Sequence, residues 1–287
     1  MDRDQSNAYM AYKGYVVRVP HNPLVVSFDI SRAEAKSTMT LLESFKIWQY
    51  IAMNEHVGEI QKNYYAKTAS EYDSQHLSHG DEHYRALHYL HGIIQLNDFK
   101  RILDLGAGTG RAALFLKELH PEIEIISIEP VKELREIGIA KGLSPQEIID
   151  GDIYSLEFED SSFDLVSAFG VFHHLENPIS ALEEMKRVSR NSIFISDSNN
   201  FGQGKALSRF LKQALHFFGI WNLTVLVKTR GKKYQISQGD GLAYSFSLFG
   251  LTKLLHSVYS VYFLSTVPSR KNLFKTASHI AIYAQKK

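Results

Sequence analysis

Three glycines at alternate positions follow an apolar run in RILDLGAGTG, residues 101–110. Glycine adopts backbone conformations that other residues avoid, so Gly106, Gly108 and Gly110 let the chain turn sharply and approach a ligand closely. A helix that begins directly after the turn would present its free N–H groups there. The pattern GxGxG therefore predicts a nucleotide-type cofactor loop. The overlapping GxGxxA pattern, which ends at Ala113, leaves the cofactor open.

An acidic residue ends the next apolar run, in IISIEP. Glu129 lies about 20 residues beyond the loop, where a carboxylate can accept hydrogen bonds from both ribose hydroxyls. This spacing also suits NAD, so it supports a nucleotide-type cofactor without identifying it.

These residues need a sheet to position them, and the pattern from about residue 100 predicts one. Short β-rich runs alternate with helical stretches, at residues 101–105, 123–128, 147–150, 163–169 and 191–196. This alternation is typical of βαβ units and predicts parallel strands with crossover helices. Two last runs, 259–267 and 277–287, have no predicted helix between them. We expect an α/β fold with a doubly wound, mostly parallel seven-stranded sheet and an antiparallel last strand.

Composition restricts the class of protein. There are 32 Lys and Arg against 31 Asp and Glu, a formal charge of +1, so no nucleic-acid partner is expected. The chain has no cysteine, which excludes disulfides, Cys-ligated metals and thiolate nucleophiles. The first residues lack a signal-peptide pattern, and no apolar stretch reaches the ~20 residues of a membrane span. We therefore expect a cytoplasmic protein.

The order of the motifs resembles that of class I S-adenosylmethionine-dependent methyltransferases, in particular the ubiquinone-biosynthesis type. The resemblance covers roughly residues 60–200, through DLGAGTG, IEP, GDIYSLEFEDSSFDLV, HHL and LEEMKRV. It implies S-adenosyl-L-methionine as the cofactor and S-adenosyl-L-homocysteine as the product.

The resemblance also implies roles for individual residues. Asp104 and the loop residues Gly106, Ala107, Gly108 and Gly110 would hold the methionine end of the cofactor. Glu129, with Pro130, would hold the ribose, Asp152 the adenine amino group, and Ile153 the purine face. Phe169 and Gly170 would line the sulfonium. Tyr65 and Tyr72 would either cover the cofactor or pack their helix on the sheet.

The acceptor is less closely defined. A hydroxyl nucleophile must lose a proton, and His173, His174 or Asp197 could take it. A structural role for the histidines stays open, because relatives with this pair act on varied acceptors. A catechol-type magnesium site would need a carboxylate where the sequence is AFG, so metal-independent transfer is expected. We expect a small-molecule acceptor, with O-methylation first and N-methylation second.

Segments outside the alternating pattern complete the predicted organisation. Residues 14–30 predict a hairpin around a Pro-His-Asn-Pro turn, and a helix through about residue 56 would cover the core or form the face of a homodimer. The predicted parts are an N-terminal extension 1–60, a Rossmann-like core 61–200, an inserted helical cap 201–255 and the last two strands 256–287.

Three alternatives remain. Residues 205–221 form a basic amphipathic pattern that usually covers a core, but it would also suit a lipid-linked acceptor or an anionic membrane surface. An NAD-dependent oxidoreductase is the rival enzyme class, against which Asp104 and Asp152 argue. A non-catalytic S-adenosylmethionine-binding subunit is the other rival.

Overall fold

The computed structural model describes residues 8–12, 15–19, 57–78, 80–269 and 272–287. The chain divides into two units, Met1–Met53 and Asn54–Lys287. In the first unit, β1 (Ala8–Tyr12) pairs antiparallel with β2 (Tyr15–Val19). The hairpin predicted over residues 14–30 needs a second strand after its Pro-His-Asn-Pro turn. That strand, the turn and the helix predicted after it lie outside the described residues, so the hairpin stays a prediction.

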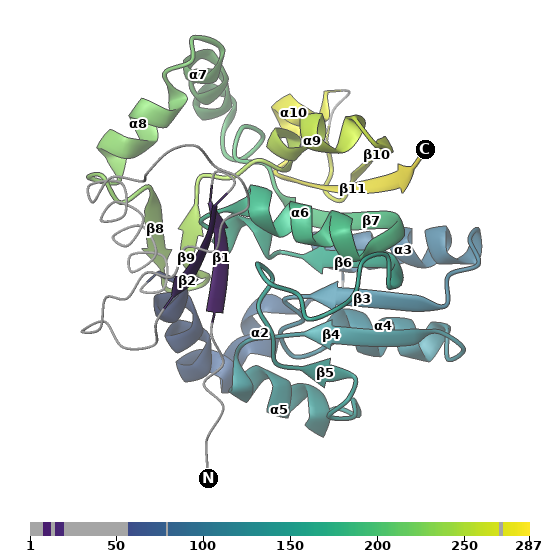
Figure 1. The fold of residues 1–287 in the computed structure, drawn as a ribbon. Helices are drawn as coiled ribbons and strands as arrows, with labels where there is room; N and C mark the ends of the chain where they lie inside the picture. The colour runs from purple at the N-terminus through teal and green to yellow at the C-terminus, as the bar shows by residue number, and fades with distance from the viewer. Residues whose placement is uncertain (1–7, 13–14, 20–56, 79, 270–271) are drawn as a thin grey trace. The chain divides into compact units, whose positions relative to one another are not determined.

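The second unit contains a seven-stranded sheet whose spatial order is β10-β11-β7-β6-β3-β4-β5 (Figure 1). All neighbouring pairs from β7 to β5 are parallel, and β11 is antiparallel to both β7 and β10. The strands are β3 (Arg101–Leu105), β4 (Glu124–Ile128), β5 (Ile148–Ile149), β6 (Phe163–Phe169), β7 (Ser189–Ser198), β10 (Tyr259–Ser265) and β11 (His279–Lys286). The predicted fold class is confirmed. A four-residue helix, α10 (Leu273–Thr276), separates the last two strands, where no helix was predicted.

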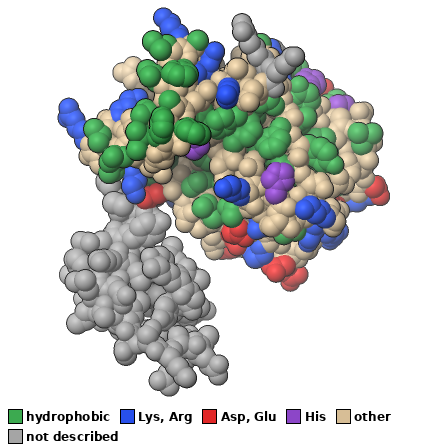
Figure 2. Space-filling view, turned by 90° about the horizontal axis from the view of Figure 1, so that it is seen from above, with side chains coloured by type: hydrophobic (Ala, Val, Ile, Leu, Met, Phe, Trp, Pro, Cys, Tyr) green, Lys and Arg blue, Asp and Glu red, His purple; other side chains and the backbone are tan. Residues whose placement is uncertain are grey.

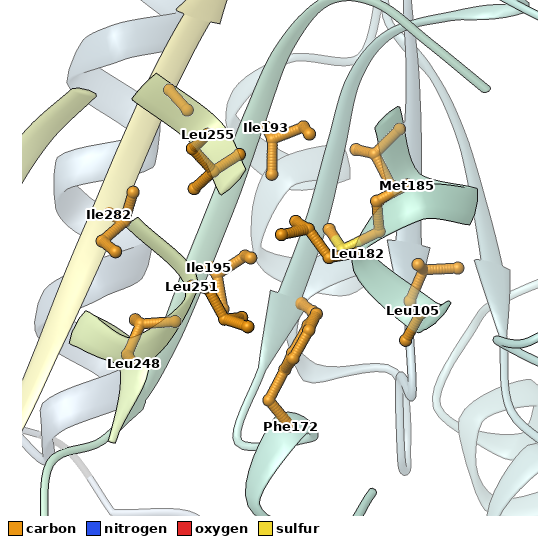
Figure 3. Close-up of a cluster of buried hydrophobic side chains, with 14 of the residues drawn as sticks. Leu105, Phe172, Leu182, Met185, Ile193, Ile195, Leu248, Leu251, Leu255 and Ile282 are labelled. Atoms are coloured by element: carbon orange, nitrogen blue, oxygen red, sulfur yellow. The ribbon is translucent and has the colours of Figure 1, made fainter. Parts of the chain in front are cut away.

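Helices cover both faces of the sheet because successive strand residues point to opposite sides. Ile193 and Ile195 of β7 join one buried cluster, while Phe194 joins the other. The first cluster is closed by α6 (Pro178–Val188) and α9 (Thr252–His256), and Figure 3 shows their side chains meeting those of β7 and β11. The second is closed by α3 (Glu82–Gln95) and α4 (Arg111–Leu119). A further helix, α5 (Lys132–Ala140), lies between β4 and β5 along the chain.

The strand order changes direction at β3. From β3 the chain proceeds through β4 to β5 on one side, then continues with β6 and β7 on the other. In open α/β sheets, ligands bind outside the carboxyl ends of the strands at such a point. The glycine loop, Glu129, Phe169 and Asp197 all stand at these strand ends.

The segment between β7 and β10 is not helical throughout. It contains α7 (Ala206–Phe217), α8 (Trp221–Lys228), the antiparallel pair β8 (Tyr234–Ser237) and β9 (Gly241–Tyr244), and a 3-10 turn Leu248–Leu251. Leu248, Leu251 and Leu255 are buried in the main core. The last part of the predicted cap therefore packs as core.

Candidate functional site

The glycine loop has the backbone that its sequence predicts. Gly106, Gly108 and Gly110 all have positive φ, at 66°, 57° and 80°. A Cβ at Gly108 would lie 2.6 Å from the Tyr72 hydroxyl oxygen, and one at Gly106 would lie 2.5 Å from Val171 Cγ2. Conformation and close packing therefore both require glycine here.

Two buried carboxylates stand beside this loop. Glu129 Oε2 accepts a hydrogen bond from Gly108 N at 2.8 Å, and Oε1 accepts one from Val131 N at 2.9 Å. Asp104 accepts a hydrogen bond from the Ser167 hydroxyl at 3.0 Å. Burial raises the pKa of each carboxyl to about 7, despite these hydrogen bonds. A cationic, hydroxyl-bearing ligand would compensate both groups, so the residues present fit S-adenosylmethionine.

Cofactor binding should depend on pH through Glu129. Because its pKa is raised to about 7, the carboxylate predicted to accept the ribose hydroxyls is lost as the pH falls through that value. Affinity for S-adenosyl-L-homocysteine should fall about tenfold between pH 8 and pH 6 by linkage. Calorimetry at both values measures this. Glu129→Gln should reduce the dependence, whereas Glu124→Gln, at an exposed site, should leave it unchanged; equal wild-type affinities at both pH values would contradict the assignment.

A cavity of about 760 Å³ opens at this edge, within the range of small-molecule sites. The sequence-predicted residues that line it are Tyr65, Tyr72, Asp104, Gly106, Ala107, Phe169, Gly170, His173 and His174. Those that do not line it are Gly108, Gly110, Glu129, Pro130, Asp152, Ile153 and Asp197. Most of the residues predicted for the methionine end and the sulfonium thus share one cavity with the two histidines.

The residues predicted for adenine are arranged differently. Asp152 is exposed, and its Oδ1 accepts a hydrogen bond from Tyr154 N at 2.9 Å. Ile153 is half-buried against the main core, and Pro130 is exposed. The roles of these three residues remain predictions.

His173 is held between two carboxylates. Its Nδ1 lies 2.9 Å from Asp197 Oδ1, and its Nε2 lies 3.3 Å from Asp240 Oδ2. Burial alone would lower the pKa of His173, but the charge of Asp197, a hydrogen bond to it and the contacts with Asp240 raise it to about 10. His173 is therefore an imidazolium with both N–H groups engaged, and it has no lone pair for a proton.

His174 has the opposite character. Its Nδ1 lies 2.6 Å from the Leu242 carbonyl oxygen, which can only accept, and 3.2 Å from Gln61 Nε2, which can only donate; the shorter contact places the proton on Nδ1. Its Nε2 then accepts a hydrogen bond from the Tyr65 hydroxyl at 3.1 Å. Burial and the adjacent charge of His173 lower the pKa of His174 to about 4. His174 is an uncharged imidazole at neutral pH.

Asp197 is a positioning residue in this geometry. It is completely buried, and its Oδ2 accepts a hydrogen bond from Phe172 N at 2.8 Å. Burial would raise the pKa of Asp197, but the charge of His173 and its hydrogen bonds lower it to about 2. Asp197 thus fixes the 3-10 turn Phe172–His174 and orients His173 from behind.

Two further residues lie at the site although the sequence did not assign them to it. Asp240, between β8 and β9, lies 3.5 Å from His174 Nε2 through Oδ1. His83 of α3 is half-buried, with Nδ1 3.0 Å from the Ser196 hydroxyl, and a Cβ at Gly170 would lie 2.9 Å from its Nε2. Asp240 stands in no local motif that could have revealed it.

Among the described residues, His173, His174 and Asp240 offer ligand atoms within 4.8 Å of one another. Such a set could hold a divalent cation. However, an Nε2–H of the charged His173 directed at Asp240 already accounts for the contact. Metal-independent transfer therefore stays the prediction.

Comparison with known proteins agrees with this geometry. Residues 103–195 match the family model of a methyltransferase domain, and residues 36–143 match that of protein-L-isoaspartate(D-aspartate) O-methyltransferase. An uncharacterized methyltransferase of Schizosaccharomyces pombe is 36% identical over 101 residues, 31% of this chain and 36% of that protein. Demethylmenaquinone methyltransferase of Thermotoga maritima is 33% identical over 135 residues, 44% of this chain and 57% of that protein. The chain thus spans only part of the length of these relatives.

A solved structure shares the fold. A chain from the complex that contains the Haloferax volcanii Trm112 methyltransferase activator matches with a TM-score of 0.50 at 13% identity, over 79% of this chain and 97% of that one. The sheet order and the glycine loop define a Rossmann-like α/β protein with a nucleotide-type site. With the family match, the chain contains a class I S-adenosylmethionine-dependent methyltransferase domain.

Proposed function

We propose that this protein transfers the methyl group of S-adenosylmethionine to a hydroxyl oxygen of a small organic acceptor. The observation that carries the proposal is the uncharged His174, which lines the same cavity as Asp104 and Phe169. The name of the demethylmenaquinone relative supports a small-molecule acceptor. When bound, the cofactor supplies an electrophilic methyl group: a C–O bond forms as the C–S bond breaks, and the bond pair stays on sulfur.

His174 receives the proton that the hydroxyl releases. Its Nε2 now accepts a hydrogen bond from the Tyr65 hydroxyl, which the acceptor hydroxyl must replace to donate its proton there, while the Nδ1–H stays on the Leu242 carbonyl. Asp240 Oδ1, 3.5 Å from Nε2, stabilises the charge that then develops on the ring. A base within hydrogen-bond reach of the reacting hydroxyl typically contributes 10²–10⁴-fold to the rate.

The remaining predicted residues would hold the cofactor. Asp104, next to Gly106 and Ala107, would pair with the ammonium group at the methionine end. Glu129 would hold the ribose hydroxyls and Phe169 the sulfonium. Tyr65 and Tyr72 close the site from the helical segment upstream of β3; Tyr72 already touches the loop, as the contact at Gly108 shows.

A product assay tests the proposal. Purified protein is incubated with S-adenosylmethionine and panels of phenols, alcohols and amines, and both S-adenosyl-L-homocysteine and methylated product are measured by mass spectrometry. We expect acceptor-dependent turnover with a hydroxyl compound. Binding of the cofactor without turnover on any panel would favour a non-catalytic subunit, and uptake of NAD instead would contradict the proposal.

An amine acceptor is the second candidate. Asp240 is 43% exposed at the cavity, so its carboxylate is available to an ammonium group. A neutral amine attacks the methyl group without prior loss of a proton, so N-methylation would depend little on His174. The same panel distinguishes the two acceptors.

Turnover should survive removal of divalent cations. Because the charged His173 directs one N–H at Asp197 and the other at Asp240, the cluster is held together without a metal cation. Activity after dialysis against EDTA should remain within about twofold of the untreated value, less than a 0.5 kcal/mol change in the barrier. An acceptor assay with and without added Mg²⁺ or Zn²⁺ measures this; loss of activity that a cation restores would show that His173, His174 and Asp240 form a metal site.

A further inference from the structure

Charge is strongly segregated along this chain. The segment from Ser198 to Gly239 contains seven Lys and Arg residues and no Asp or Glu. Since the whole chain carries a formal charge of +1, all its other residues together carry −6. This basic segment includes α7, α8 and the loop that follows them.

The apolar face predicted on α7 does not cover a core. No residue of α7 or α8 is buried, whereas α6 buries Ala181, Leu182, Met185 and Val188. The large hydrophobic side chains exposed on α7, α8 and the turn between them are Leu207, Phe210, Leu211, Phe217, Phe218, Ile220, Leu223, Leu226 and Val227. Phe217 is 84% exposed and Phe218 71%. An apolar surface of this extent marks an interaction site.

The basic residues border this surface. Figure 2 shows hydrophobic side chains gathered on the face seen from above, with Lys and Arg side chains around them. Within the part of the chain that the structure describes, no carboxylate forms a salt bridge with Lys205, Arg209, Lys228, Arg230 or Lys232. Their charges are therefore available to an external anion.

The opposite side of the pair is anchored on the protein. Lys212 donates a hydrogen bond to the Gln203 carbonyl at 2.8 Å, and the Trp221 and Phe201 rings lie 5.6 Å apart. Trp221, Val225 and Lys228 also line the site cavity. One side of the helix pair therefore lines the cavity, and its apolar side faces outward.

The geometry suits a helix pair lying in a membrane surface. Of the described residues, no single helix is long and apolar enough to span a bilayer; α7 and α8 meet that test only together, and they are bent by 118°. Their lengths, 12 and 8 residues, correspond to ~18 and ~12 Å, well below the ~30 Å of a hydrocarbon core. Basic borders around an apolar face are typical of interfacial helices.

We propose that α7 and α8 dock this protein on an anionic membrane surface, with Phe210, Phe217 and Phe218 entering the headgroup region and the flanking Lys and Arg contacting lipid phosphates. A second copy of the chain fits less well, because two such surfaces would bring like charges together. An anionic bilayer matches both the apolar face and the excess positive charge. The proposal does not depend on which acceptor is methylated.

Vesicle co-sedimentation of the 287-residue chain tests the proposal. Wild-type protein should bind phosphatidylcholine vesicles containing phosphatidylglycerol at least about tenfold more tightly than pure phosphatidylcholine, given ~1 kcal/mol for each basic residue at the surface. The double variant Phe217→Ser/Phe218→Ser should lose at least about tenfold of that binding. The double variant Arg230→Gln/Lys232→Gln should also weaken vesicle binding. The effect should be larger at low salt than at high salt, because salt screens the charges.

Matched controls separate docking from general surface effects. Leu96→Ser changes a side chain that is 85% exposed at the end of α3, and Lys132→Gln changes an exposed charge on α5; both should bind vesicles like the wild type. All variants should keep wild-type affinity for S-adenosyl-L-homocysteine. Equal binding to neutral and anionic vesicles, no vesicle binding, or self-association that only Phe217→Ser/Phe218→Ser abolishes would each overturn the proposal.

Discussion

Gly108→Val should lower the affinity for S-adenosyl-L-homocysteine at least about hundredfold, a loss of roughly 2.7 kcal/mol. The backbone at Gly108 has φ of 57°, which a β-branched residue avoids, and its Cβ would lie 2.6 Å from the Tyr72 hydroxyl oxygen. The loop must therefore move away from both Tyr72 and Glu129, whose Oε2 accepts from Gly108 N. Isothermal titration calorimetry measures the loss.

A matched substitution shows whether the effect is local. Gly92 lies in α3, and a Cβ there would meet nothing within 4 Å, so Gly92→Val should keep near wild-type affinity. Glu129→Ala removes the ribose acceptor and should weaken binding at least about tenfold, the value of one hydrogen bond to a charged group. Circular dichroism should show all three variants folded. Wild-type affinity in Gly108→Val and Glu129→Ala would show that the cofactor binds elsewhere.

His174→Ala should lower kcat by about 10²–10⁴-fold on a hydroxyl acceptor, because it removes the uncharged imidazole placed to take the proton. Cofactor affinity should change little, since none of the cofactor contacts proposed here involves His174. The comparison of kcat with KM is informative: a base acts in the transition state, so the loss should appear in kcat, whereas a residue that only positions the acceptor would raise KM.

His256→Ala is the matched control for this experiment. His256 is exposed at the end of α9, outside the cavity lining, so its removal should leave kcat unchanged. Steady-state kinetics with saturating S-adenosylmethionine measures both variants. A His174→Ala enzyme with wild-type kcat on hydroxyl compounds would remove His174 from the mechanism and leave amine methylation as the better account.

Most of the sheet could be predicted from the sequence because its signals are local. Five runs of apolar residues and the helical stretches between them fall where β3 to β7 and their helices form. The glycine loop was equally predictable, since positive φ at Gly106 and Gly108 is a property of those residues themselves. The pairing of Ala8–Tyr12 with Tyr15–Val19 was not predicted, because a local pattern does not say which strand a segment pairs with.

Sequence motifs predicted which histidines lie at the site, but they did not predict the protonation state of each. His173 and His174 are adjacent and of the same type, yet one pKa is raised to about 10 and the other lowered to about 4. The difference comes from Asp197 and Asp240, which the fold brings from β7 and from the loop after β8. Likewise, the pattern of α7 predicts an apolar face, and only the fold leaves it open.

The sequence by itself thus determined the strands of the main sheet and the cofactor loop, because backbone preferences and apolar spacing act over a few residues, whereas the class of methyl donor came from the resemblance of its motifs to a known family. Tertiary structure alone decided which histidine is charged, that Asp240 joins the site, and which apolar face stays uncovered. These properties depend on burial and on distances in space between residues far apart in the chain, and such distances are set only when the whole sheet and its insertion pack together.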